Sequence, residues 1–318
     1  MELVPGFAFQ PTTPPVPTPA PVPAPAVPPP DLGALQGLVG SWAGAGFNTI
    51  WRPTQPATGS DRFLEINVTA ENLEFEVIPG TIPNRGLLQG DLFMTGVRYL
   101  QQISDSNVKD PATGQDSGLH IEPGLWLSVP VTTNPTVPAT VARLASIPHG
   151  TTIIAQGLAS TAAGGPAVPT VSITPFAIGN PGAPVTFPEQ TLVAQSNFRT
   201  SGVGLTGVTQ AMLDNPNSVL AAPAGQAIAN TTTLVVSSDA TTPVLGGGTA
   251  NTAFLQGGPG GPNAVAARVD ATFWIQTTKG SATPDLLQYS QVVLLNFNGL
   301  SWPHITVATL KKQPPAGP

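Results

Sequence analysis

The segment Trp302-Pro-His-Ile-Thr-Val-Ala-Thr-Leu-Lys-Lys312 decides the expected fold. In an extended strand, successive side chains point to opposite faces, so residues two apart share a face. Two sets of side chains therefore alternate along the segment: Ile305, Val307 and Thr309 on one face, and His304, Thr306, Ala308 and Leu310 on the other. This alternation predicts a β-strand, the last of a series.

Asn298-Gly299 stands just before this strand and predicts a hairpin turn, because glycine tolerates a positive φ there. Similar β-prone runs predict strands at residues 41–51, 63–69, 73–78, 87–104 with a bend, 119–129, 141–147, 151–158, 271–277, 287–297 and 304–310. About ten antiparallel strands close into a barrel, which removes exposed edges and can enclose a small ligand. The expected fold class is therefore all-β. One helix is expected, around residues 208–213, and Pro216 ends it soon after.

The composition excludes several other classes of protein. The 318 residues include 34 glycines and 38 prolines, which are costly inside helices, so an all-α bundle and a doubly wound α/β fold are excluded. The net charge is −6, and the only adjacent basic pair is Lys311 and Lys312, so a nucleic-acid partner is not expected. The absence of cysteine excludes disulfides and thiolate metal sites.

The distribution of proline and charge divides the chain into four parts. Residues 1–34 form a Pro-rich extended arm, with 11 prolines among residues 11–30. Residues 35–158 supply the first part of the barrel, and residues 268–318 its last strands and a short tail. Between them, residues 159–267 read as an insertion rich in Ala, Gly, Pro and Thr. From position 144 to 267 only four residues are charged, so the insertion is expected to cover the barrel or to meet a partner subunit.

Targeting and membrane segments are not visible in the sequence. The N-terminus lacks a basic region followed by an apolar stretch, so no signal peptide is expected. No run approaches the roughly 20 apolar residues that a membrane span needs. We expect a soluble chain, and the compartment stays open.

The three histidines are the main candidates for chemistry. His120 opens one expected strand, and Glu122, two residues further on, points the same way, so the two side chains could share a metal. His149 lies in a Pro-His-Gly turn and is most simply a surface residue. His304 lies in the last strand, where a neutral imidazole would be held rigidly enough to bind iron.

Four motifs, in the same order along the chain, resemble those of the nitrobindin family of heme-binding, calycin-like barrels. Gly40-Ser-Trp-Ala-Gly-Ala-Gly46 resembles the family's opening Gly-x-Trp-x-Gly-x-Gly. Leu119-His-Ile-Glu-Pro-Gly124 resembles its Met-His-x-Glu-x-Gly strand, and Leu144-Ala-Ser-Ile-Pro-His-Gly150 its strand ending in Gln-Pro-Thr-Gly. The segment from Trp302 to Leu310 resembles its closing Pro-His strand. The resemblance covers residues 35–158 and 268–312.

The resemblance implies a heme inside the barrel, with iron bound by His304. It also implies cofactor contacts from His120, on the distal side, and from Thr49. One departure touches this site: the family's Tyr-Pro-Thr-Ile is replaced by Phe47-Asn-Thr-Ile50. Alternatives stay open for each residue, since His304 could be an ordinary hydrogen-bonded barrel residue and His120 could bond a loop carbonyl. The insertion could also fill the cavity.

Three functions follow as hypotheses. The first is a heme-binding barrel that acts on reactive nitrogen or oxygen species, for example in peroxynitrite isomerisation. The second is the same barrel without heme, holding a small apolar molecule. The third is a self-assembling protein, a homo-oligomer whose subunits meet through the Pro-rich arm and the insertion. Whether the chain is an enzyme is left open.

Overall fold

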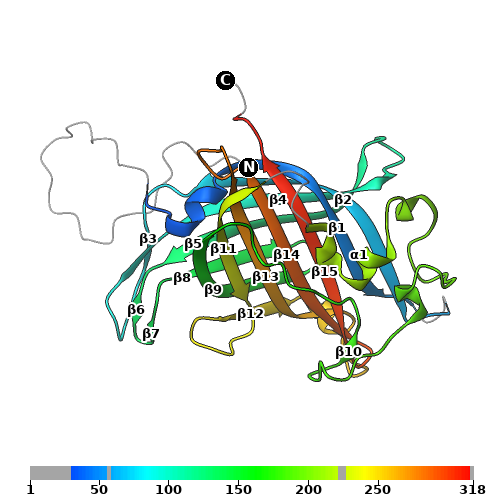
Figure 1. Cartoon of the computed structure of the whole chain (residues 1–318). Coiled ribbons are helices and arrows are strands. Elements are labelled where there is room, and N and C mark those ends of the chain that lie inside the picture. Colours follow the sequence, from blue (N-terminus) through cyan, green and yellow to red (C-terminus); the bar gives the residue numbers. More distant parts are fainter. Residues whose placement is uncertain (1–29, 56–58, 221–226, 316–318) are drawn as a thin grey trace, which may run out of the picture.

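The structure, a computed structural model, describes residues 30–55, 59–220 and 227–315. Ten antiparallel strands form a closed barrel in it, because β1 pairs with both β2 and β15 (Figure 1). In order around the barrel, the strands are β1 (Gly40–Pro53), β2 (Arg62–Val77), β4 (Leu92–Lys109), β5 (Asp116–Val129), β8 (Thr140–Ile147), β9 (Thr151–Ala163), β11 (Ile228–Ser237), β13 (Val265–Thr278), β14 (Leu286–Phe297) and β15 (Leu300–Lys312). The all-β barrel is confirmed.

Short elements decorate the barrel. Among the described residues, the additional strands are β3 (Ile82–Asn84), β6 (Thr132–Thr133), β7 (Thr136–Val137), β10 (Phe176–Ala177) and β12 (Gly246–Asn251). The helices are α1 (Gln210–Asp214) and α2 (Ala253–Gln256), with 3₁₀ turns η1 (Gly33–Leu38), η3 (Pro188–Gln190), η4 (Gly202–Leu205) and η5 (Pro216–Leu220). The expected helix is thus present as α1, followed by η5. No helix in the described part of the chain is long and apolar enough to cross a membrane.

The strand boundaries correct the sequence expectation at three places. Residues 63–69 and 73–78 belong to one continuous strand, β2, because pairing with β1 continues through residues 70–72. The bent strand expected from residue 87 begins at Leu92 instead, and Leu87 is exposed. Third, the sequence places residues 228–237 in the insertion, but they form β11, a strand of the barrel wall that pairs with β9 and β13. Its Thr-rich sequence has too little alternation to mark it as a barrel strand.

The turn at Asn298-Gly299 is confirmed. It joins β14 to β15, and both residues have a positive φ, 48° at Asn298 and 75° at Gly299. These angles suit the tight hairpin turn whose twist matches that of the flanking strands. The turn sets the register that places His304 opposite Val293.

One end of the barrel interior is filled with apolar side chains. The turn η1 precedes β1 and buries Leu32, Leu35 and Leu38 there. They pack in one cluster with inward-facing aromatic side chains of the strands: Trp42, Phe75, Trp126 and Phe273. Figure 1 shows η1 in blue at this end. Each fully buried apolar side chain of this kind stabilises the fold by roughly 1.5–3 kcal/mol.

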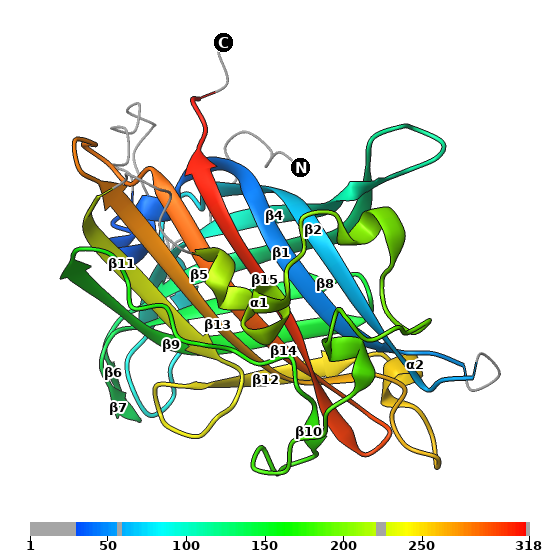
Figure 2. The same cartoon turned by 45° about the vertical axis from the view of Figure 1, so that its right-hand side comes forward.

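The charge-poor segment after β9 covers part of the outer face of the barrel. Its apolar residues, among them Ile173, Leu213 and Leu220, pack against Phe47, Trp51, Ile305 and Val307. Figure 2 shows α1 and its neighbouring turns lying across β15 and β1. Of the two expected roles for the insertion, this part of it covers the barrel. Residues 1–29 of the Pro-rich arm lie outside the described residues, so the role of the arm as a subunit contact stays a prediction. The arm was expected to be extended as far as residue 34, but Gly33 and Ala34 already belong to η1.

Candidate functional site

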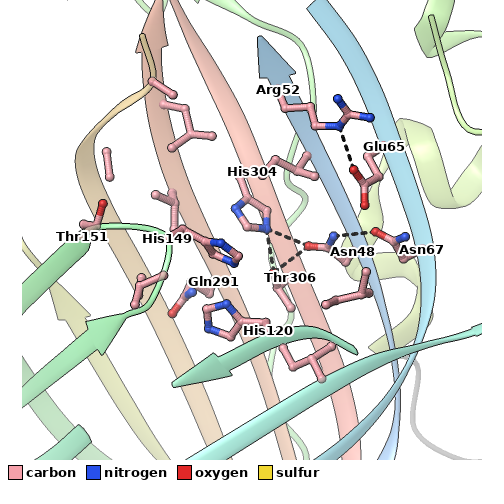
Figure 3. A pocket seen from close by; sticks show the side chains of 18 of the residues that line it. Asn48, Arg52, Glu65, Asn67, His120, His149, Thr151, Gln291, His304 and Thr306 are labelled. Atoms are coloured by element: carbon pink, nitrogen blue, oxygen red, sulfur yellow. Dashed lines mark hydrogen bonds and ion pairs between the residues drawn. The ribbon is translucent and has the colours of Figure 1, made fainter. Parts of the chain in front are cut away.

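The other end of the barrel encloses a cavity of about 330 Å³. All three histidines of the chain line it, together with two sets of side chains. The apolar set includes Ile50, Ile103, Leu119, Ile147, Leu255, Val293 and Leu295, and the polar set includes Asn48, Asn67, Gln101, Tyr289, Gln291 and Thr306. The mouth lies at the end of β1, marked by Arg52 and Pro53, and is therefore opposite to η1, which precedes β1. Figure 3 shows Arg52 and the three histidines around the cavity.

His304 lies on the cavity wall and is half-buried. The alternation of β15 turns His304 and Thr306 inward, and Ile305 and Val307 outward into the apolar cluster under the covering segment. The Nε2 atom of His304 lies 2.8 Å from Asn48 Oδ1 and 3.3 Å from Thr306 Oγ1. Burial, with repulsion from His120 and His149, lowers the pKa of His304 to about 3, so the imidazole is neutral at physiological pH.

A line of hydrogen bonds runs from His304 through two amides to a carboxylate (Figure 3 shows the part up to Asn67). Asn48 Nδ2 donates to Asn67 Oδ1 at 3.0 Å, and Asn67 Nδ2 donates to Asp105 Oδ2 at 2.9 Å. These three residues come from β1, β2 and β4, and all are buried. The side chain of His304 is therefore held by residues from three neighbouring strands.

His120 and His149 lie next to each other on a different part of the cavity wall. Their ring centroids are 5.7 Å apart, and the ring planes make an angle of 33°. His120 Nε2 lies 3.4 Å from Glu122 Oε2, so the two side chains point the same way, as the sequence predicts. A carboxylate, and not a loop carbonyl, is the partner of His120. Partial desolvation at the rim, with repulsion from His120, lowers the pKa of His149.

His149 was expected as a surface residue of a turn. It does lie in the turn between β8 and β9 and is exposed, but it also lines the mouth of the cavity. The sequence could not show this, because the position of the turn relative to the barrel mouth depends on how the barrel closes.

A buried charged group lies between the cavity and the filled end. Glu122 Oε1 accepts hydrogen bonds from Arg143 and from the Tyr99 hydroxyl, and Arg143 also donates to Gln291 on the cavity wall. Burial alone would raise the pKa of Glu122, but the charge of Arg143 outweighs it and lowers the pKa to about 2. Glu122 and Arg143 are therefore both charged at neutral pH.

Glu71 is a second buried carboxyl group close to the cavity. It accepts hydrogen bonds from Tyr289, Gln101 and Thr69, and burial raises its pKa to about 7. A Cβ atom at Gly46 would lie 2.8 Å from Glu71 Oε1 and 2.3 Å from the carbonyl oxygen of Val307. Gly46, the last glycine of the opening motif, is therefore needed for close packing in the barrel wall.

Thr49 is not at the cavity, contrary to the expectation from the resemblance. Its neighbours Asn48 and Ile50 line the cavity, so the two-residue period turns Thr49 to the outer side of β1, with Phe47 and Trp51. Its side chain is fully buried, and the hydroxyl has no hydrogen-bond partner among the described residues.

Several cavity residues were missed by sequence reasoning, most importantly Asn48, Gln101, Tyr289 and Gln291. The signal that could have found them is the alternation of strands already predicted, since polar residues at inward positions mark a cavity wall.

The sequence suggested that His120 and Glu122 could share a metal ion. Among the described residues, no group of three or more His, Asp or Glu side chains is placed to hold one, so no third ligand joins this pair.

Comparisons with known proteins find similarity among solved structures. No protein-family model and no curated protein matches the chain. Among solved structures, the chain is similar to the crystal structure of Rv2717c from M. tuberculosis, with 18% sequence identity, 89% of this chain and 100% of that chain covered, and a TM-score of 0.37. At this level of identity and score, the similarity carries no argument about function.

Proposed function

We propose that the barrel binds heme in its cavity and that His304 is the protein ligand to the iron. The observation that carries this proposal is a neutral imidazole on the wall of a largely apolar cavity, at the position that the closing motif assigns to an iron ligand. Iron is bound by the nitrogen of a neutral imidazole. Protons therefore compete little with the metal for a histidine whose pKa is about 3.

The residues of the cavity fit such a group in their chemistry. Ile50, Ile103, Val293 and Leu295 would offer apolar contacts to the macrocycle, and His304 would offer a nitrogen ligand to the iron. A bound heme would supply an iron centre that coordinates small molecules. His120 and His149 would supply hydrogen bonds to whatever shares the cavity with it. The reactive nitrogen and oxygen species implied by the sequence resemblance are therefore the first substrates to test.

A second candidate is a barrel without heme that holds a smaller apolar molecule. The volume of the cavity favours it, because about 330 Å³ is at the low end of the roughly 300–1,000 Å³ typical of ligand pockets. The apolar wall and the polar side chains Gln101 and Gln291 would then orient one small ligand.

Hemin titration followed by Soret absorption tests the proposal. We expect a saturable Soret shift with the wild-type protein and a loss of at least tenfold in affinity for His304→Ala. His149→Ala, a histidine at the rim of the same cavity, is the matched control and should bind hemin nearly as tightly as wild type. Equal affinity of wild type and His304→Ala rules out His304 as the ligand. If wild type gives no shift, binding of a fluorescent apolar probe decides for the second candidate.

A further inference from the structure

We infer that Asp105, Asn67 and Asn48 are positioning residues that set the tautomer of His304, with the proton on Nε2 and Nδ1 left as the nitrogen that bonds in the cavity. The inference deepens the proposed function and rests on it only for the role of His304 in binding. What it adds is the ring nitrogen involved and the three residues that select it.

The first step is the anchor at Asp105, which is 3% exposed. Its Oδ1 accepts the main-chain N–H groups of Asn107 at 2.8 Å and of Val108 at 3.3 Å, and its Oδ2 accepts Asn67 Nδ2 at 2.9 Å. A carboxylate offers only acceptors. The NH₂ end of the Asn67 amide must therefore face Asp105.

In the second step, the orientation of the Asn67 amide determines that of the Asn48 amide on the next strand. With its NH₂ end at Asp105, the Asn67 amide presents its oxygen to Asn48, and Asn48 Nδ2 donates to that oxygen at 3.0 Å. An amide has one donor end and one acceptor end, so the orientation of Asn67 fixes that of Asn48. The oxygen of Asn48 is thereby directed at the ring of His304.

The third step occurs at His304 itself. Asn48 Oδ1 lies 2.8 Å from His304 Nε2 and also accepts the hydroxyl hydrogen of Thr306 at 2.9 Å. Because Thr306 gives its hydrogen to Asn48, its oxygen can only accept from His304 Nε2, at 3.3 Å. Two acceptors face Nε2, so that nitrogen must carry the proton. A lone pair there would face two oxygen lone pairs.

The consequence concerns the chemical class of the bound group. With Nε2 occupied, Nδ1 carries the lone pair, and it can bind a Lewis acid such as iron or accept a hydrogen bond from an O–H or N–H group of a ligand. Asn48 stands where the motif of the nitrobindin family has proline, which has no side-chain acceptor. The departure from that motif thus supplies the oxygen that holds His304.

Ligand-free protein with ¹⁵N-labelled histidine tests the inference, because ring nitrogen shifts distinguish protonated from unprotonated nitrogen. The chain has only three histidines, so His120→Ala and His149→Ala variants assign the His304 signals. In wild type at neutral pH we expect the Nε2–H form almost exclusively. In Asn48→Leu, the Thr306 hydroxyl is free to donate to Nε2, so the population should shift toward the Nδ1–H form.

Asp105→Asn tests the far end of the line without removing any side chain. The amide oxygen at position 105 keeps the main-chain N–H groups of Asn107 and Val108, so the NH₂ end faces Asn67. Asn67 and Asn48 then both reverse, and we expect the population to shift toward the Nδ1–H form. Thr49→Val, a neighbour of Asn48 that points out of the barrel, is the control and should leave the His304 signals unchanged. An Nδ1–H ring in wild type, or a wild-type population in both Asn48→Leu and Asp105→Asn, overturns the inference.

The Asp105→Asn variant and the wild-type spectrum decide the matter even if Asn48→Leu does not fold. Because these spectra are recorded without heme, failure of hemin to bind would refute the proposed function and leave the tautomer result intact. Conversely, if hemin binds but His304 in the wild-type protein is a mixture of the Nε2–H and Nδ1–H forms, only the role of Asp105, Asn67 and Asn48 is refuted.

Discussion

The two ends of the barrel interior are built on the same strands but serve different purposes. At one end, Leu35 and Leu38 of η1, with Leu32 just before it, pack into the hydrophobic core and close the barrel. At the other end, inward positions carry histidines, amides and aliphatic side chains around a cavity of about 330 Å³. The strand geometry is the same at both ends, so the size and polarity of the inward residues decide which end is filled and which is hollow.

A layer of buried polar side chains separates the two ends. Glu122 and Arg143 form an ion pair there, and Glu71 bonds to Tyr289 and Gln101. Such groups are costly to bury, and they are tolerated only when their hydrogen bonds are satisfied. We therefore expect the filled end to contribute most of the free energy of unfolding. The buried polar layer supplies the charged and polar groups next to the cavity.

The largest expected effect is at the ion pair. Arg143→Met leaves the Glu122 carboxylate buried without its cation, so we expect a loss of about 3–5 kcal/mol in the free energy of unfolding. The double variant Glu122→Gln with Arg143→Met should recover most of that loss. Urea denaturation of the three proteins measures both effects. A single variant within about 1 kcal/mol of wild type would show that the layer contributes little.

The two ends can be compared directly with matched leucines. Leu35→Ala in η1 removes a fully buried side chain and should cost about 2–5 kcal/mol, because the filled end cannot close the space left behind. Leu255→Ala at the half-buried cavity rim should cost less than about 1 kcal/mol. Thermal or urea unfolding gives the two values. Equal losses would remove the distinction between a filled and a hollow end.

The smallest of these effects concerns the pH dependence caused by Glu71. Its pKa is about 7 in the folded chain and near 4.5 when unfolded, so the folded state keeps a proton that the unfolded state loses. Stability should therefore fall as pH rises from 4.5 to 7 and then level off, by at most roughly 3 kcal/mol. Glu71→Gln should lack this fall.

Urea midpoints of wild type and Glu71→Gln between pH 4.5 and 8 test this expectation. The difference between the two curves isolates Glu71 from the other titrating groups. A difference that is flat with pH, or that changes in the opposite direction, would show that Glu71 is ionised in the folded chain throughout this range.

Local sequence patterns were enough for the all-β fold, the closing hairpin at Asn298-Gly299 and the shared face of His304 and Thr306, whereas the inward direction of that face followed only from the family resemblance. These features depend on the two-residue period of a strand and on the φ angles of two turn residues, which neighbours in sequence determine. The same reasoning failed for β11, whose Thr-rich sequence shows no clear alternation, and for Thr49, whose position followed a motif instead of the period of its strand.

Only the tertiary structure decided which residues meet across the barrel. The 256 positions between Asn48 and His304 are bridged because β1 pairs with β15, and Asn67 and Asp105 join them because β2 and β4 follow in the same sheet. His149 reaches the cavity mouth for the same reason. The sequence by itself determined that the chain makes alternating strands and that the histidine of the last strand, His304, shares a face with Thr306. Barrel closure decided the partners of that histidine, because contacts between distant strands depend on register and curvature, which no local pattern encodes.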